Sequence, residues 1–436
     1  MGEHTLDRRT FVKATGATGL AVLGAGLLGE TRGRASSGKV EITMWEHQSP
    51  PEEAALLVDL KTFEQKYPNI VIKRVRQDFG TTFEKVTSAV AAGTGPDISP
   101  VYSGLLSQFA SQGAVIPLDQ FGAGSLQSQY FAPAWSYCTY QGHVYGLPYA
   151  NDPRYLIYNQ RLFEQAGLNP AKPPTTWDQV IQYAQRLTKR DSRGNLRVAG
   201  LAIPTDGTEE QIGFFLTTMY QFGGSNLLNE NRTKATFNNE YGIKALQLMV
   251  DLQHKYNITP PPPASQANNE SGFDAGKIAM YIYGKWGVQS AHQYAPGIPL
   301  GVAPWPYPSG GRPGNYVTVG AYMIYKHCQN PEQAYTFIKW MTGTQAENAR
   351  MLNYNVSPRR DATSDPQIRA LEGKIPTIKT EQFVPQGVTL PYTPKMAQIL
   401  KALGPDLQAA VTKSKTVAQA LKDAEANVNN ILNSQL

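Results

Sequence analysis

Cysteine and histidine are scarce in this sequence, and their scarcity excludes several kinds of chemistry. The chain has two cysteines, Cys138 and Cys328, and six histidines that stand apart from one another. Neither cysteine lies in a CxxC pair and the histidines lack metal-ligand spacing, so the sequence predicts no metal site and no cofactor. The two cysteines are expected either to form a bridge or to stay as buried free thiols, and the sequence leaves both open.

Charged residues and long apolar runs are also few. Charged residues make up 17% of the chain and hydrophobic residues 41%, a balance that excludes a disordered chain. Beyond the N-terminal region no run reaches the roughly 18 apolar residues of a membrane-spanning helix, so we expect a soluble mature protein. No basic run with interleaved aromatic residues is present, which argues against a nucleic-acid partner.

The common catalytic motifs are missing as well. The sequence has no GxSxG, no GxxxxGK[ST], no GxGxxG and no HExxH pattern. Carboxylates are plentiful, so a glycoside hydrolase with two catalytic carboxylates stays open. The length of 436 residues exceeds the roughly 250–300 residues that one hydrophobic core serves, which predicts two domains.

The first 35 residues have the pattern of an export signal. Arg8 and Arg9 precede a short apolar stretch of about 16 residues, and small residues follow up to Ala35. The paired arginines, with Phe11 and Lys13, indicate the twin-arginine pathway and a periplasmic or extracytoplasmic location. An uncleaved membrane anchor is the alternative. Cleavage would remove five basic and three acidic residues and lower the net charge from +6 to +4.

Strands and helices alternate along the first 100 residues of the mature chain. Strand patterns start at Val40, Ile70 and Pro96. Capping boxes that begin at Ser49 and Thr81 predict helices between them. This order is typical of an α/β domain with a largely parallel sheet.

The same alternation recurs after residue 150. The pattern predicts further helices after the capping residues Thr176 and Thr416, after Asn330, and over 241–256. Further strands are expected over 156–158, 198–203, 277–283 and 317–325.

Aromatic residues are abundant, with six tryptophans and 23 tyrosines. A sugar ring packs its C–H face on an aromatic ring and turns its hydroxyl groups toward planar polar side chains. The segments Trp45–Gln48 and Tyr149–Asp152 offer that mixture at predicted strand ends. A neutral-sugar site is therefore the hypothesis that these residues favour, although any single aromatic residue is more often part of a core.

Several spaced segments of the chain form one recognisable set. The central ones are Tyr145–Tyr149, Leu156–Asn159, Leu162–Phe163, Ala166–Leu168 and Pro173–Trp177. Further stretches are Gly93–Ile98, Gly276–Met280, Gly284–Trp286 and Gly320–Gly343. Together they resemble the extracellular solute-binding proteins of ABC importers, in the maltose-binding-protein branch that takes sugars and oligosaccharides. The likeness spans essentially the whole mature chain in order.

The resemblance implies an α/β fold of two lobes joined by hinge crossovers, the type II periplasmic-binding-protein fold. The first lobe would comprise 36–150 and 320–353, and the second 155–316 and 359–436. The crossovers would lie at 151–154, 316–320 and 353–358. Both cysteines would then fall in the first lobe, where a bridge could form.

The resemblance also implies a non-catalytic function. The protein would act as a monomer that captures a carbohydrate in the cleft, closes around it, and delivers it to the membrane permease. The ligand-binding residues would be Trp45, Glu46, His47, Tyr102, Ser103, Asn151, Asp152, Tyr220, Trp286 and Tyr322. Among these, Trp286 would stack on a sugar ring.

Two other functions remain open from the sequence. A secreted glycoside hydrolase would use carboxylates that no motif pairs. A binder of a polyol phosphate or another anion would need converging cations, for which Arg154 and Arg359–Arg360 are the support.

Overall fold

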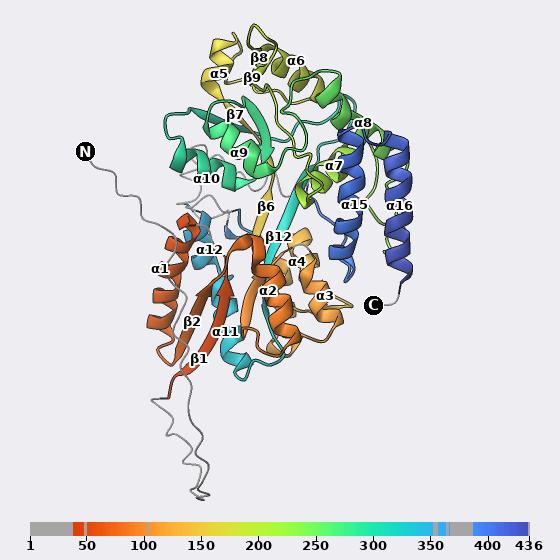
Figure 1. Cartoon of the computed structure of the whole chain (residues 1–436). Coiled ribbons are helices and arrows are strands. Elements are labelled where there is room, and N and C mark those ends of the chain that lie inside the picture. Colours follow the sequence, from red (N-terminus) through yellow and green to blue (C-terminus); the bar gives the residue numbers. More distant parts are fainter. Residues whose placement is uncertain are drawn as a thin grey trace, which may run out of the picture. The chain divides into compact units, whose positions relative to one another are not determined.

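The computed structural model describes residues 38–47, 50–102, 104–351, 356–362, 366 and 387–434 (Figure 1). The expected export signal, residues 1–35, lies outside the described residues, and so does Ser103. Among the described residues, none of the helices combines the length and the apolar character needed to cross a bilayer.

A parallel sheet, here called the first sheet, begins the fold as the alternation predicted. Strand β1 (Val40–Glu46) pairs in parallel with β2 (Ile70–Arg76) and with β3 (Ile98–Val101). Helices α1 (Pro50–Lys66) and α2 (Phe79–Ala91) connect them. Alternate residues of β1 such as Ile42 and Met44 are fully buried, because successive side chains of a strand point to opposite faces.

Strand β12 (Asn315–Ile324) extends this sheet from a distant part of the chain. It pairs antiparallel with β3 and with β6 (Leu147–Pro153), and in parallel with the short β13 (Gly387–Val388). The strand order of this path is β13-β12-β3-β1-β2, with β6 paired to β12 beside it. The first sheet is therefore mixed, because β12 runs antiparallel to β3 and β6 while the other pairs run parallel.

Helices and short strands from two parts of the chain pack around the first sheet and its helix α1. Helix α11 packs Phe337 against Phe63 of α1 at 4.9 Å between ring centroids. The covering elements are α3 (Leu105–Ser111), η1 (Leu118–Phe121), η2 (Ala123–Gln129), α4 (Ala132–Tyr137), β4 (Thr139–Tyr140), β5 (His143–Val144), α11 (Pro331–Met341) and α12 (Thr344–Met351).

A second sheet has the order β10-β7-β11, and its neighbouring strands run antiparallel. Its strands are β7 (Tyr155–Asn159), β10 (Met280–Tyr283) and β11 (Leu300–Ala303). Its surrounding elements are α5 (Gln160–Gln165), α6 (Trp177–Leu187), β8 (Lys189–Arg190), β9 (Leu196–Val198), α7 (Glu209–Gln221), α8 (Glu240–His254), α9 (Gln266–Asp274) and α10 (Lys285–Tyr294).

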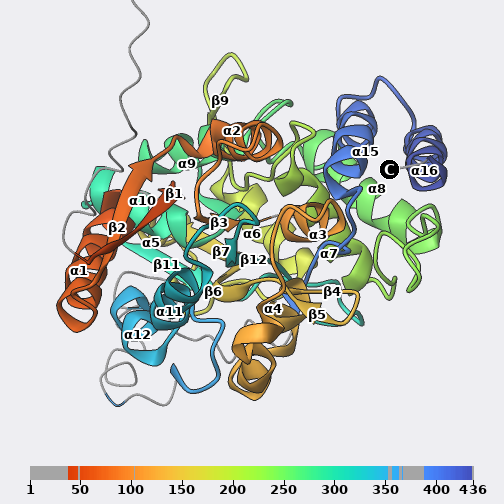
Figure 2. The same cartoon turned by 90° about the horizontal axis from the view of Figure 1, so that it is seen from below.

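Two C-terminal helices, α15 (Met396–Val411) and α16 (Val417–Asn433), complete the core beside α7 and α8 (Figures 1 and 2). Leu407 and Leu421 are fully buried there. The capping residues were predicted correctly, because the hydroxyls of Thr176 and Thr416 accept hydrogen bonds from the third backbone N–H group of α6 and α16.

Some local predictions were wrong. Helix α2 begins at Phe79, two residues before the predicted cap Thr81, whose N–H donates to the carbonyl of Asp78. Only Val198 of the predicted strand 198–203 belongs to a strand, β9, while Ala199 and Ala202 form isolated parallel bridges beside β10. The apolar run 198–203 has the composition of a buried strand, but after Val198 the structure forms only isolated bridges from it and no continuous ladder.

The two cysteines are free and buried. The structure thus decides between the two alternatives in favour of free thiols. Burial raises the pKa of both, and that of Cys328 reaches about 12. Neutral thiols of this kind behave as small apolar side chains.

Candidate functional site

A cavity of about 510 Å³ lies between residues of the two sheets. That volume is within the range of small-molecule sites. Its lining residues are His47, Glu52, Arg76, Gln77, Asp78, Tyr102, Arg154, Thr208, Glu209, Glu210, Tyr283, Trp286 and Thr318. They come from many separate segments, so the cavity exists only in the folded chain.

The first sheet contributes residues that directly follow its parallel strands. His47 follows β1, Gln77 and Asp78 follow β2, and Tyr102 follows β3. Parallel strands end at the same edge of a sheet, which is where α/β proteins bind ligands. The register of Val40–Glu46 with Ile70–Arg76 brings these ends level.

The second side of the cavity is made by a crossover segment and two helix starts. Arg154 lies between β6 and β7, Glu209 and Glu210 begin α7, and Trp286 is the second residue of α10. The backbone of Arg154 is held by Asn315, which accepts from its N–H at 2.8 Å and donates to its carbonyl at 2.7 Å.

Aromatic rings face the cavity from both sides. Trp286 is partly exposed, and its ring centroid lies 5.7 Å from that of Tyr283. The guanidinium of Arg154 lies over the Trp286 ring at 4.9 Å from the centroid. On the other side, His47 and Tyr102 have ring centroids 5.8 Å apart. These rings supply flat apolar surface beside charged and hydroxyl groups.

The cations of the cavity are already paired with carboxylates of the protein. Arg154 donates from Nε to Glu210 Oε2 at 3.0 Å and from Nη2 to Glu210 Oε1. Arg76 lies 3.3 Å from Glu53, measured between Nη1 and Oε2. Burial alone would lower the pKa of Arg154, but Glu210 raises it above its ordinary value. Arg154 thus stays charged and held in place.

A buried lysine connects the two sides of the cavity. Lys285 Nζ, on a side chain that is 3% exposed, lies 2.8 Å from Glu52 Oε1 and 3.3 Å from Asp152 Oδ1. Glu52 belongs to α1, Asp152 to β6 and Lys285 to α10. Burial would lower the pKa of Lys285, but the two carboxylates raise it. Burial also raises the pKa of Asp152 against the opposing effect of Lys285 and Arg154.

The structure brings some of the predicted site residues together. His47, Tyr102 and Trp286 line the cavity. Asp152 does not line the cavity but is buried beside it, where it pairs with Lys285, which in turn pairs with the lining residue Glu52. Ser103 lies outside the described residues.

Other predicted residues point elsewhere. Trp45 packs on the core around Val101, and Glu46 is buried against Arg74 at 3.1 Å. Asn151 is fully buried in the crossover, where its N–H donates to the carbonyl of Val356 at 2.9 Å. These side chains are not among those that line the cavity in the described part of the chain.

Two tyrosines are also placed away from the cavity. Tyr220 lies near the far end of α7, roughly 16 Å along the helix from Glu209, with Arg312 over its ring at 3.7 Å from the centroid. Tyr322 is 1% exposed and packs on Tyr149 with centroids 4.6 Å apart. Strand β12 is buried on both faces around Tyr322, so this ring packs in the core rather than facing the cavity.

Sequence reasoning missed much of the polar lining. The missed residues are Glu52, Arg76, Gln77, Asp78, Thr208, Glu209, Glu210, Tyr283 and Thr318. The length of β2 could have indicated two of them. A strand that ends at Arg76 places Gln77 and Asp78 at the carboxyl edge of the sheet. Another signal was Thr208 followed by two glutamates, which is typical of a helix start.

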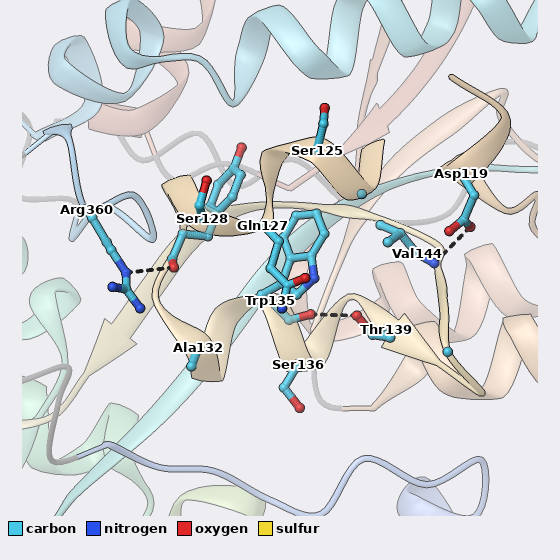
Figure 3. A pocket seen from close by; sticks show the side chains of 13 residues that line it. Asp119, Ser125, Gln127, Ser128, Ala132, Trp135, Ser136, Thr139, Val144 and Arg360 are labelled. Atoms are coloured by element: carbon cyan, nitrogen blue, oxygen red, sulfur yellow. Dashed lines mark hydrogen bonds between the residues drawn. The ribbon is translucent and has the colours of Figure 1, made fainter. Parts of the chain in front are cut away.

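A larger hollow, of about 860 Å³, lies among η1, η2, α4 and the β4–β5 hairpin (Figure 3). The hydrogen bonds drawn there join residues of its own walls. Arg360 Nε donates to the Tyr130 carbonyl at 3.0 Å, Thr139 Oγ1 to the Trp135 carbonyl at 3.0 Å, and the Val144 N–H to Asp119 Oδ2 at 3.0 Å. Its aromatic residues, Tyr130 and Trp135, are 1% and 6% exposed, so they offer little stacking surface.

Among the described residues, no group of three or more His, Cys, Asp or Glu side chains is arranged to hold a metal ion. The cavity between the sheets is the candidate binding site, because it joins aromatic surface with planar polar side chains.

Comparison with known proteins places this site in a context. A family model described as bacterial extracellular solute-binding protein matches residues 48–348. The chain resembles the crystal structure of an ABC transporter solute-binding protein from Thermotoga lettingae bound with alpha-D-tagatose. The TM-score is 0.79 at 28% identity, over 90% of this chain and 99% of that one.

Two curated relatives are similar over most of the chain. The maltotriose-binding protein of Pyrococcus abyssi is 23% identical over 382 residues, which cover 84% of this chain and 76% of the relative. The galactooligosaccharide-binding protein of Bacillus subtilis is 22% identical over 413 residues, which cover 94% and 93%.

The environment of His47 predicts a pH dependence of stability. Burial, aided by Lys285 and opposed by Glu52, lowers the pKa of His47 from 6.5 to about 4. Below pH 6.5 the unfolded chain therefore binds a proton that the folded chain does not. We expect this residue to lower the free energy of unfolding by at most about 1.4 kcal/mol per pH unit between pH 6.5 and 4.

Urea unfolding of the wild type and of His47→Gln at pH 7, 6, 5 and 4.5 measures this effect. The wild type should lose more stability than the variant as the pH falls. His143→Gln, at an exposed histidine, is the matched control. Parallel curves for the wild type and His47→Gln would contradict the prediction.

Proposed function

Because the chain belongs to the bacterial extracellular solute-binding proteins, we propose that it is the substrate-binding subunit of an ABC importer. It captures a sugar or oligosaccharide in the cavity between the two sheets and delivers it to the permease. The observation that carries this proposal is the combination of Trp286, Tyr283 and Tyr102 with planar polar groups in one cavity. The resemblance found in the sequence and the two-lobed type II fold are confirmed.

The named ligands of relatives support a carbohydrate. Relatives are named for maltotriose and galactooligosaccharide, and a similar structure holds alpha-D-tagatose. Stacking rings with hydroxyl, amide and carboxylate groups are what a sugar of this kind requires. The protein acts as a monomer outside the cytoplasm.

The two proposed lobes centre on the two sheets, except that β13, in the segment 359–436, pairs with β12 of the first sheet. We assign residues 36–150 and 320–353 to the first lobe and residues 155–316 and 359–436 to the second. Crossover backbones lie side by side, which supports a common hinge. The Asn151 N–H donates to the Val356 carbonyl at 2.9 Å, and the Arg154 N–H to the Tyr316 carbonyl at 3.1 Å. Directly after the third crossover, Arg359 forms an isolated antiparallel bridge with Tyr130 of the first lobe.

The charges of the cavity argue against an anionic ligand. Helices α1, α2, α7 and α10 all begin at the cavity, and helix N-termini attract anions. Carboxylates of the protein already occupy the starts of the first three, through Glu52, Asp78 and Glu209 with Glu210. A polyol phosphate would meet these carboxylates, whereas a neutral sugar can accept and donate hydrogen bonds among them.

Several carboxylates of the cavity are committed to ion pairs, which favours binding over hydrolysis. Glu210 pairs with Arg154, and Glu52 pairs with Lys285. The two catalytic carboxyl groups of a glycosidase must reach the glycosidic bond, whereas these carboxylates are held on cations of the protein. The protein therefore returns its ligand intact.

Binding of a sugar should stabilise the folded chain. A sugar that binds the folded chain at 100 times its dissociation constant should add about 2.7 kcal/mol to the free energy of unfolding. Thermal unfolding against a panel of mono- and oligosaccharides measures this shift. Absence of a shift with every member would contradict the proposal.

Mass analysis of each oligosaccharide after incubation separates binding from hydrolysis. Intact ligand supports the binding function, and shorter products would support the glycoside hydrolase. A phosphorylated ligand that binds tightly at low salt and weakly at high salt would instead support the anion-binding alternative.

Trp286 should be a main source of affinity. Trp286→Ala is expected to weaken binding by about 1–3 kcal/mol, because it removes the ring on which a sugar can stack. Titration calorimetry measures the loss, and Trp286→Phe, which keeps a ring, is the matched variant. Equal affinity in Trp286→Ala, at unchanged unfolding temperature, would exclude Trp286 from the site.

Export should depend on the paired arginines. We propose that residues 1–35 direct the folded protein through the twin-arginine pathway. Replacing Arg8 and Arg9 together by lysine should leave the precursor in the cytoplasm, as fractionation and immunoblotting would show. Undiminished export of the double variant would indicate a different route.

A further inference from the structure

The ion pair between Glu52 and Lys285 joins the two lobes directly. Glu52 lies in the first turn of α1, which packs beside the first sheet, and Lys285 is the first residue of α10, which follows β10 of the second sheet. Figures 1 and 2 both show α1 and α10 on the same side of the molecule. Lys285 Nζ and Glu52 Oε1 are 2.8 Å apart, so this ion pair links α10 to α1 beside the cavity.

The burial of this pair distinguishes it from a surface salt bridge. The side chains of Lys285, Asp152 and Glu52 are 3%, 0% and 17% exposed. Surface ion pairs contribute little, whereas breaking a buried one leaves an uncompensated charge. Lys285 also has a second carboxylate, Asp152, on the crossover strand β6.

Opening of the lobes should affect the two partners of Lys285, Glu52 and Asp152, differently. Asp152 belongs to a crossover and pairs through its backbone with Thr318 of β12. Glu52 belongs to the first lobe alone, so a hinge motion that separates the lobes moves it away from Lys285. Opening therefore breaks the Glu52 contact and leaves Lys285 paired with Asp152.

We propose that Glu52 and Lys285 are positioning residues that hold the lobes closed and so set how long a ligand stays bound. The proposal rests on the proposed function for its ligand, but closure itself is testable without one. Lys285 is not among the residues that line the cavity, so it acts through Glu52 and its neighbour Trp286. An affinity that includes closure weakens by the fraction of molecules that are open.

Glu52→Gln is the variant that tests this. It removes the interlobe charge while Asp152 still compensates the buried Lys285, so the fold should persist. We expect a larger radius of gyration for the ligand-free variant in small-angle X-ray scattering. For the sugar that binds the wild type best, we expect the dissociation constant to rise by about 5- to 50-fold, mostly through faster dissociation.

Glu53→Gln is the matched control. Glu53 is the next residue of the same helix and carries the same charge, but its partners Arg74 and Arg76 belong to the first lobe. It should leave the scattering curve of the ligand-free protein unchanged, because it breaks no contact between the lobes. A direct contact between Glu52 and ligand would change the affinity but not the scattering of the ligand-free protein.

A double-mutant cycle with Lys285→Gln completes the test. The effects of Glu52→Gln and Lys285→Gln on the dissociation rate should be strongly non-additive if they form one contact. Lys285→Arg, which keeps the charge, should retain most of the closure. If Glu52→Gln failed to fold, Glu52→Asp would shorten the side chain and should show the same change in scattering.

The outcomes separate the two proposals. A Glu52→Gln variant that matches Glu53→Gln in scattering and the wild type in dissociation rate overturns the closure role, whatever the ligand. A wild type that binds no sugar, with a Glu52→Gln variant that is still more open, overturns the proposed ligand class and leaves the closure pair standing.

Discussion

The antiparallel ladder between β6 and β12 is the contact on which the other features of the cavity depend. Val317–Tyr322 pairs with Leu147–Pro153, so two crossings between the sheets are hydrogen-bonded to each other along the junction. The ladder shifts register at Gly320, where a Cβ atom would approach Tyr102 and Tyr149 to 2.8 Å. A glycine there lets the hydroxyl of Tyr149 donate to that of Tyr102 at 2.6 Å. Backbone pairing at the junction thus also places an aromatic wall of the cavity.

Electrostatics adds a second constraint, because several helices start at one cavity. Converging N-termini would make the cavity strongly attractive to anions if nothing balanced them. The protein balances them with carboxylates of its own, and it pairs the remaining cations, Arg154 and Lys285, with some of those carboxylates. The result is a polar cavity in which the positive charges of Arg154 and Lys285 are each compensated by a carboxylate. Such a site suits an uncharged ligand that is rich in hydroxyl groups, and the same ion pairs can fix the relative position of the lobes.

Much of the fold could be predicted from the sequence because local patterns decide it. The capping residues Thr176 and Thr416, the first three strands and the apolar face of α11 all formed as expected, since each depends on residues a few positions apart. The site was predicted less completely. His47, Tyr102 and Trp286 line the cavity, whereas Tyr220 and Tyr322, which lie close to a loop or a crossover along the chain, are placed away from it. Closeness along the chain does not say which face of a strand or which end of a helix a side chain occupies.

The sequence by itself determined the family, the order of strands and helices, and the abundance of aromatic residues, because these are properties of short segments and their spacing. Only the tertiary structure decided which polar residues join the aromatic ones. Glu52, Asp152 and Lys285 stand far apart in the sequence, but in the folded chain Lys285 lies 2.8 Å from Glu52 and 3.3 Å from Asp152. The free state of both cysteines was decided there as well. Long-range pairing sets these contacts, and no local pattern records which distant segments will pair.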